Sequence, residues 1–179
     1  MEKKNFTVSV YTENNPGLLS RIAAIFLKRH INIESITVSK SEVKEVMRFI
    51  IVVDVTEEKI NKVVGQIEKQ IEVIKAYYHT DEEMIFQETA LYKVRTSDFE
   101  KDLKLEDFLK GTKARIVTVT PDFFVIEKTG KRHETESLYE KLKPYGIMQF
   151  VRSGRIAVSK NEMQISSMLE KFNTTNSNS

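Results

Sequence analysis

The chain has 179 residues, of which 40% are hydrophobic and 30% charged, with a net charge of +2 at pH 7 and no cysteine. This length allows one large domain or two small ones, and the composition is typical of a soluble globular protein. The lack of cysteine excludes disulfides, thiol catalysis and thiolate metal sites, and the small net charge indicates neither a nucleic-acid nor a membrane partner. No apolar run is long enough to cross a bilayer and the N-terminus shows no signal-peptide pattern, so we expect a cytoplasmic protein.

The first half of the chain reads as strand, helix, strand, strand, helix, strand. Apolar and polar residues alternate from Phe6 to Thr12, which predicts the first strand. A helix with an apolar stripe is predicted over about residues 16–29, with Pro16 at its first position, where a missing N–H costs nothing. The elements expected after it are strands at 33–39 and 46–55, a polar hairpin loop at 39–45, a helix that follows an N-cap at Thr56, and a strand at 72–79.

The strand at 46–55 has two unequal faces. One face is entirely apolar and carries Met47, Phe49, Ile51, Val53 and Val55. The other face alternates charged with apolar residues and carries Arg48, Ile50, Val52 and Asp54. Because half of this second face is apolar, we predict that something covers part of it.

The second half repeats the same order. A strand is expected at 88–96, and Ser97 with Glu100 fits a capping box that starts a helix ending near Gly111. The elements expected after it are strands at 115–120 and 123–128, a helix that ends at 144–146, and a last strand at 147–152 that 155–159 continues. Each half is therefore a βαββαβ unit, and the fold class is α+β with two ferredoxin-like domains.

These patterns set the expected domain boundaries. The first domain covers residues 1–79, a connector covers 80–87, and the second domain covers 88–172, with a polar and disordered tail at 173–179. The second domain includes an extra helix at 161–172. Its apolar stripe is formed by Ile165, Met168, Leu169 and Phe172. We hypothesise that this stripe packs on the second domain, since apolar stripes at helical spacing usually face a core.

The sequence contains no convincing catalytic or metal site. The three histidines, His30, His79 and His133, fall on unrelated elements, and none has the spacing of a metal ligand. No phosphate-binding glycine motif is present. RNA-binding proteins of the same fold need aromatic residues and a glycine-rich basic motif on the central strands, and the strand at 46–55 does not match this pattern. Tyr77 and Tyr78 are only weak evidence for base stacking. We therefore expect no active site, no metal and no nucleic-acid partner.

The corner between the first strand and the first helix is the strongest candidate binding feature. Asn14 to Arg21 reads Asn-Asn-Pro-Gly-Leu-Leu-Ser-Arg, and the start of a helix can present free N–H groups to a carboxylate. On spacing alone a plain turn is the preferred interpretation, because short motifs match by chance. Asn32 supplies a second element, since its side chain offers both a donor and an acceptor to an amino acid ligand.

These residues resemble a known family. The stretches at 14–21 and 32–38 resemble the ACT domain of the acetolactate synthase (acetohydroxyacid synthase) small regulatory subunit. The second half resembles that subunit's C-terminal domain, in residues 119–122, 127–130, 142–147 and 152–159. The resemblance covers about residues 4 to 160. The N-terminal motif alone indicates only an ACT domain, and the two halves together are more specific.

The resemblance implies a non-catalytic subunit of branched-chain amino acid biosynthesis, including the synthesis of valine and isoleucine. Such a subunit activates the large catalytic subunit and mediates allosteric feedback inhibition by valine or a related amino acid. It also implies a homodimer through paired ACT domains, with the effector between them. Carried over to this chain, the effector-binding residues are Asn14, Gly17, Leu18 and Leu19 of one protomer with Asn32 and Ile33 of its neighbour. This chain would hold no cofactor, and thiamine diphosphate, Mg and FAD are expected on the catalytic partner.

Two points of this interpretation stay open at the sequence level. Leu18 is bulky, so the size of the pocket and the choice among valine, leucine and isoleucine are open. The surface that contacts the catalytic subunit is also open, with the second domain and the turn from Arg152 to Arg155 as candidates. The alternatives are a free-standing ACT-domain amino-acid sensor that controls another enzyme or a transcription factor, and an RNA-binding protein of the same fold.

Overall fold

The computed structural model describes residues 2–99 and 109–176, without the side chains of 98, 99 and 172–176. Its residues form two compact units. The first unit contains residues up to Ile85 together with the described residues from Arg155 onward, and the second runs from Phe86 to Gly154. No helix in the described ranges is long and apolar enough to span a membrane.

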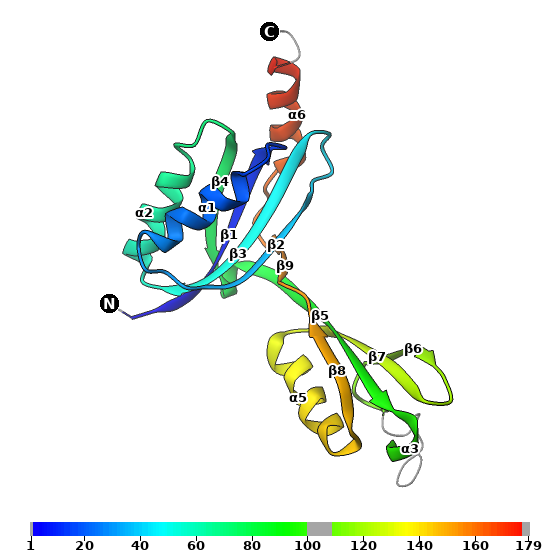
Figure 1. Cartoon of the computed structure of the whole chain (residues 1–179). Coiled ribbons are helices and arrows are strands. Elements are labelled where there is room, and N and C mark those ends of the chain that lie inside the picture. The colour runs from blue at the N-terminus through cyan, green and yellow to red at the C-terminus, as the bar shows by residue number, and fades with distance from the viewer. Residues whose placement is uncertain (1, 100–108, 177–179) are drawn as a thin grey trace. The chain divides into compact units, whose positions relative to one another are not determined.

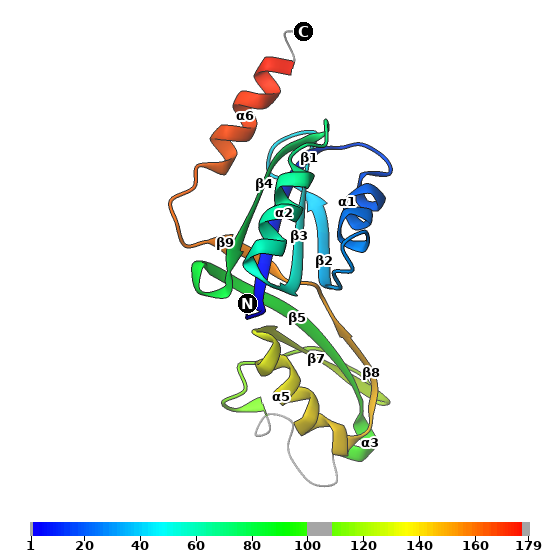
Figure 2. The same ribbon diagram turned by 90° about the vertical axis from the view of Figure 1, so that its left-hand side faces the viewer.

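The first unit has the predicted βαββαβ order (Figure 1). Its elements are β1 (Lys4–Glu13), α1 (Leu18–Leu27), β2 (Ile33–Lys40), β3 (Val46–Val55), α2 (Glu57–Ile67) and β4 (Val73–Thr80). The four strands form an antiparallel sheet in the order β2-β3-β1-β4, which leaves β2 at one edge. Both helices lie on the same face of this sheet (Figure 2).

The core of the first unit lies between this sheet and the two helices. Alternation along β1 places Phe6, Val8 and Val10 in the core, each no more than 1% exposed. The apolar stripe of α2 faces them with Ile60, Val63, Val64 and Ile67. Thr56 occupies the predicted N-cap position of α2, but its side chain makes no capping hydrogen bond.

Helix α1 begins at Leu18, two residues later than predicted. Gly17 precedes it with φ of 83°, a left-handed conformation that cannot continue a right-handed helix and that glycine adopts without steric cost. The chain therefore turns through Pro16 and Gly17 before the helix starts. The buried stripe of α1 is Leu18, Ile22, Ile25 and Phe26, whereas Leu19 is 47% exposed.

The second unit repeats the order around its own sheet. Its elements are β5 (Met84–Arg95), α3 (Thr96–Phe99), β6 (Arg115–Val119), β7 (Phe123–Gly130), α5 (Arg132–Leu142), the 3₁₀ helix η2 (Lys143–Tyr145) and β8 (Ile147–Arg152). The strand order is β6-β7-β5-β8. Tyr92 is fully buried in the core of this unit and donates its hydroxyl to the carbonyl of Thr135 at 2.5 Å. The helix predicted from the Ser97–Glu100 box to Gly111 falls largely on 100–108, outside the described residues.

The expected connector at 80–87 is wrong. A short 3₁₀ helix, η1 (Asp81–Glu83), follows β4 directly, and β5 begins at Met84. Glu83 accepts hydrogen bonds from the backbone N–H and the hydroxyl of Thr80, both at 2.8 Å. These two bonds to Glu83 hold the segment in a fixed turn, so it is not a separate linker between the units.

The C-terminal segment does not belong to the second domain, as the sequence analysis had expected. Residues from Arg155 onward return to the first unit as β9 (Ile156–Ser159), which pairs with β5, and α6 (Ile165–Asn176). The apolar residues Ile165, Met168 and Leu169 pack with Tyr11, Val43, Val46 and Tyr77 of the first unit. The hypothesis that this stripe packs on the second domain is therefore wrong.

This return explains how the second face of the first sheet is covered. Thr7, Ser9 and Tyr11 on β1 and Ile50 and Val52 on β3 point away from α1 and α2, yet none is more than 6% exposed. Arg155 donates to the hydroxyl of Thr7 at 2.7 Å, and Leu169 is fully buried on the same face. The prediction that something covers part of this face is confirmed, and the chain's own C-terminal segment covers it at Thr7 and Tyr11.

Candidate functional site

The corner at Gly17 is open to solvent and partly free of internal partners. Asn14, Pro16 and Gly17 are exposed, and the start of α1 has no side-chain capping hydrogen bond. The N–H of Leu18 donates to the carbonyl of Asn15 at 3.4 Å, which is a long hydrogen bond. The first turn of α1 therefore presents N–H groups at the surface, where the helix dipole favours an anion.

Leu18 contributes its backbone, not its side chain, to this surface. The side chain is 1% exposed and belongs to the core between the sheet and the helices. Its bulk therefore fills the protein interior and does not narrow the corner. Leu19 is the residue of the pair whose side chain lies at the surface.

The cation nearest to the start of α1 in sequence is held by an internal partner. Arg21 donates to the carboxylate of Glu72 at 2.5 Å. This hydrogen bond lowers the pKa of Glu72 below its ordinary value. Because Arg21 already forms an ion pair with Glu72, the backbone N–H groups are the better candidates to bind a carboxylate at the corner.

Asn14 also borders a small pocket that the sequence pattern did not reveal. The pocket has a volume of about 240 Å³ and is lined by Asn14 and by the hairpin residues from Lys40 to Met47. The N–H of Asn14 donates to the carbonyl of Glu45 at 3.1 Å, and Glu45 has φ of 62°. No function was predicted for this hairpin from the sequence. Its only signal was a polar run, which is typical of any hairpin loop.

The strand register separates the two halves of the predicted effector site. Glu13, next to Asn14, lies opposite Val46 at the start of β3. Ile33, next to Asn32, lies opposite Val53 near the end of β3. Seven residues of strand separate these positions, or about 23 Å at the usual rise of a strand. Within one protomer, Asn14 and Asn32 therefore cannot contact the same amino acid.

Asn32 and Ile33 lie where the edge strand of the sheet begins. Asn32 is exposed, and Ile33 is partly buried against the core. A β-bulge between Ile33 and Ser35 interrupts the pairing of β2 with β3. Because β2 is an edge strand, one side of its backbone has no neighbouring strand within the described chain, which suits it for pairing with another strand.

The structure keeps the histidines apart. His30 is exposed after α1, His79 is buried on β4, and His133 lies in α5 of the second unit. No group of three His, Asp or Glu residues within 2–99 and 109–176 could hold a metal ion.

The arginines of the 152–155 turn bind partners within the chain. Arg152 and Glu88 form an ion pair at 2.8 Å in the second unit. Arg155 donates to Asp81 at 2.5 Å in the first unit. These contacts give the turn an internal role, independent of any contact with another protein.

Comparison with known proteins places both units in one family. A family model described as the small subunit of acetolactate synthase matches residues 87–161, and a model of the AHAS small subunit-like ACT domain matches residues 8–75. The acetolactate synthase small subunit of Bacillus subtilis is 36% identical over 163 residues, which cover 90% of this chain and 93% of that protein. The small subunit of Mycobacterium bovis is 34% identical over 160 residues, covering 89% and 95%. The crystal structure of the Thermotoga maritima small subunit superposes with a TM-score of 0.80 at 28% identity, covering 89% of this chain and 99% of that one.

Proposed function

The chain belongs to the family of acetolactate synthase small subunits, and on that premise we propose that it activates a catalytic large subunit and mediates its feedback inhibition by a branched-chain amino acid. The observation that carries the proposal is the pair of family matches, one on each unit. A free-standing ACT-domain sensor would need the first match but not the second. Small subunits of this family are regulatory, so a catalytic partner is implied.

The effector site we propose lies between two copies of the chain. If β2 pairs antiparallel with β2 of a second copy about a two-fold axis, the start of one β2 lies beside the end of the other. The end of β2, at Lys40, pairs with Met47, close to the corner at Asn14. Such a dimer would bring Asn32 and Ile33 of one copy toward Asn14 and Gly17 of the other, which the single chain cannot do.

Each group at this site would have a separate task. The N–H groups of Gly17, Leu18 and Leu19 would hold the carboxylate of the amino acid at the start of α1. Asn14 and Asn32 would bind its polar end through their amide groups. Ile33 and Leu19 would offer apolar surface to the aliphatic side chain, because Leu18 is buried in the core.

The effect on the enzyme would follow from linkage. An amino acid that binds one state of the dimer more tightly shifts the attached catalytic subunit toward that state. A coupling free energy of about 1–3 kcal/mol changes the relevant affinity by roughly 5- to 150-fold, which suffices for feedback control. The chemistry, with thiamine diphosphate, Mg and FAD as its expected cofactors, would belong to the catalytic subunit in the cytoplasm.

Reconstitution tests this proposal. The chain is mixed with the acetolactate synthase large subunit from the same genome, and acetolactate formation is measured with and without valine, leucine and isoleucine. We expect a higher rate on addition of the chain and lower activity with at least one of the three amino acids. If affinity capture recovers another enzyme or a transcription factor and no large subunit, the sensor alternative holds instead.

A further inference from the structure

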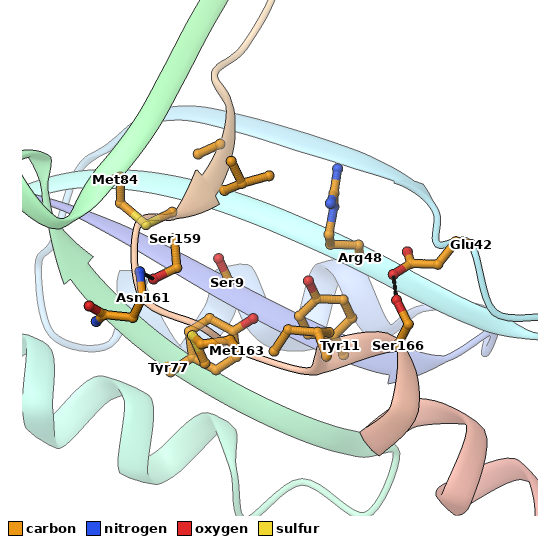
Figure 3. A pocket seen from close by; sticks show the side chains of 13 residues that line it. Ser9, Tyr11, Glu42, Arg48, Tyr77, Met84, Ser159, Asn161, Met163 and Ser166 are labelled. Carbon is orange, nitrogen blue, oxygen red and sulfur yellow. Dashed lines mark hydrogen bonds between the residues drawn. The ribbon is translucent and has the colours of Figure 1, made fainter.

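A second pocket lies on the opposite side of the first sheet from α1 and α2. Its volume is about 220 Å³. Its floor is formed by residues of β1, β3 and β4, and the C-terminal segment from Ala157 to Ser166 lies over it (Figure 3). All of its lining residues belong to the first unit. The proposed effector corner lies elsewhere, at the start of α1.

Two polar groups of this pocket make no hydrogen bond within the described chain. Ser9 is 3% exposed, and its hydroxyl makes no hydrogen bond to the residues described. Arg48 is half-buried, and its guanidinium forms neither an ion pair nor a hydrogen bond with them. A hydroxyl and a guanidinium that line a pocket without a hydrogen bond to the protein are free to donate to a ligand or to water. Together they offer donors for a carboxylate.

A carboxylate lies at the edge of the same pocket. Glu42, in the loop between β2 and β3, accepts a hydrogen bond from the hydroxyl of Ser166 at 2.6 Å. That bond, a backbone hydrogen bond and the charge of Arg48 lower the pKa of Glu42, so it is ionised at neutral pH. Glu42 and Arg48 do not form an ion pair, although both line the pocket. Opposite charges that line one small pocket without pairing suit a ligand that carries both charges.

The remaining walls are aromatic and aliphatic. Tyr11 and Tyr77 stand on the floor with ring centroids 6.1 Å apart, and burial raises the pKa of Tyr77 above its ordinary value, so its hydroxyl stays protonated. Met84 and Met163 line the pocket with Ile165. The volume is below the roughly 300–1,000 Å³ of pockets for drug-sized ligands, so the occupant must be smaller than these.

We propose that this pocket binds a small aliphatic α-amino acid, as a second site in each protomer. Arg48 and the hydroxyls of Ser9 and Tyr77 bind the carboxylate, and Glu42 binds the ammonium group. The side chain of the amino acid lies against Met84 and Met163. The site would link the β2–β3 hairpin to the C-terminal segment, since Glu42 belongs to the first and Ser166 to the second.

The six methionines of the chain allow each site to be followed separately. The full-length chain is labelled with [methyl-¹³C]methionine and titrated with L-valine in NMR spectra. Met84 and Met163 report on this pocket, Met47 borders the pocket beside Asn14, and Met148 lies in the second unit as an internal control. We expect saturable shifts of Met84 and Met163 with none at Met148.

Variants then assign the shifts. Arg48→Gln should weaken the response of Met84 and Met163 at least tenfold, while Lys62→Gln, an exposed change on α2, should leave it intact. Gly17→Asp should abolish the response of Met47 and keep that of Met84 and Met163. The amine and the 2-oxo acid that correspond to valine each lack one charge and should bind at least tenfold more weakly.

Two results would overturn the second site. One is a titration in which only Met47 shifts, which leaves the proposed regulatory function standing. The other is a response of Met84 and Met163 that disappears with Gly17→Asp and survives Arg48→Gln, because those shifts would then be transmitted from the corner. Loss of enzyme regulation in reconstitution with intact shifts at Met84 would count against the proposed function alone.

Discussion

The guanidinium of Arg155 lies 2.7 Å from the hydroxyl of Thr7, a residue 148 positions earlier in the chain. The same nitrogen donates to Asp81 at 2.5 Å, where the chain leaves the first unit. One side chain therefore joins the first strand of the first unit, the turn after its last strand, and the segment that returns. This contact fixes the start of the C-terminal segment on the sheet.

Replacing Arg155 tests this contact. Arg155→Met leaves the fully buried Thr7 hydroxyl without its donor, and we expect a loss of about 1–2 kcal/mol in the free energy of unfolding, since solvent already screens the half-exposed Asp81. Urea denaturation followed by circular dichroism measures it. Arg115→Gln is the matched control, because Arg115 is 77% exposed, and its midpoint should match that of the wild type. An equal shift in both variants would contradict the structural role of Arg155.

Leu169 anchors α6 on the outer face of the first sheet. Its side chain is fully buried against Tyr11, Val43 and Val46, so Leu169→Ala leaves a cavity and should cost about 2–5 kcal/mol. Ile71→Ala is the control, because Ile71 is 96% exposed and its replacement should change stability by less than about 0.5 kcal/mol. Thermal unfolding of both variants measures the difference. If Leu169→Ala were as stable as the control, α6 would not pack as described.

Gly17 is expected to control inhibition without controlling activation. An added Cβ would meet nothing within 4 Å, so a substitution is strained only by φ of 83°. Gly17→Asp places a negative charge beside the N–H groups and should raise the amino acid concentration for half-inhibition at least tenfold. Gly17→Asn is the control, because asparagine has the same shape as aspartate without the charge and tolerates this φ better than most residues. Its concentration for half-inhibition should be closer to that of the wild type. Equal losses of activation and inhibition in the Asp variant would argue against separate roles for the two units.

Mixed dimers test whether the effector site is shared between two copies. Asn14→Ala and Asn32→Ala should each abolish binding at the corner in homodimers. A dimer with one copy of each variant should regain one intact site, because one of its two sites keeps Asn14 from one chain and Asn32 from the other. Isothermal titration of purified mixed dimers that carry Arg48→Gln in both chains, which removes the second site, should then give half of the stoichiometry of the Arg48→Gln dimer. No recovery would place both asparagines in sites formed by a single chain.

The pH dependence of the C-terminal helix follows from Glu42. Its pKa is lowered in the folded protein, first by the hydrogen bond from Ser166 and also by the charge of Arg48. The stabilisation is therefore fully present above the ordinary value of 4.5 and is lost as pH falls through the lower folded-state pKa. Amide hydrogen exchange in α6 should rise over that acidic range. In Glu42→Gln the exchange should be faster at neutral pH and should vary less with pH.

The alternation of residues along the strands predicted most of the fold. Phe6, Val8 and Val10 on one face, and the mixed residues of β3 on the other, indicated a sheet with one helix-covered face and one face that needed another cover. The predicted start of α1, at Pro16, was two residues too early. Proline is favoured at a helix start, but the left-handed backbone of Gly17 delays the first helical residue to Leu18. The prediction relied on the statistical preference of proline, and the φ angle of Gly17 outweighed that preference.

The partner of α6 could not be predicted from periodicity. The spacing of Ile165, Met168 and Leu169 shows that the helix has an apolar face but not which surface meets it. The same limit applied at the corner. Side-chain chemistry suggested that Asn14 and Asn32 bind one ligand, and the family resemblance implied that they do so from neighbouring protomers. The strand register adds the physical reason, because within one chain they lie at opposite ends of the sheet. The separate roles of Leu18 and Leu19 also needed the helix start, since a shift in that start changes which residue points inward.

The return of the chain at Arg155 affects the order in which the protein can fold during synthesis. The second unit is an insertion between two pieces of the first, at Ile85 and Arg155. The inserted unit has a continuous sequence and can fold as soon as it leaves the ribosome. The part of the outer face of the first sheet that holds Tyr11 and Val46 stays uncovered until Leu169 has been translated. A nascent chain that stops before this point exposes an apolar sheet surface, so we expect ribosome-bound intermediates of this length to recruit chaperones.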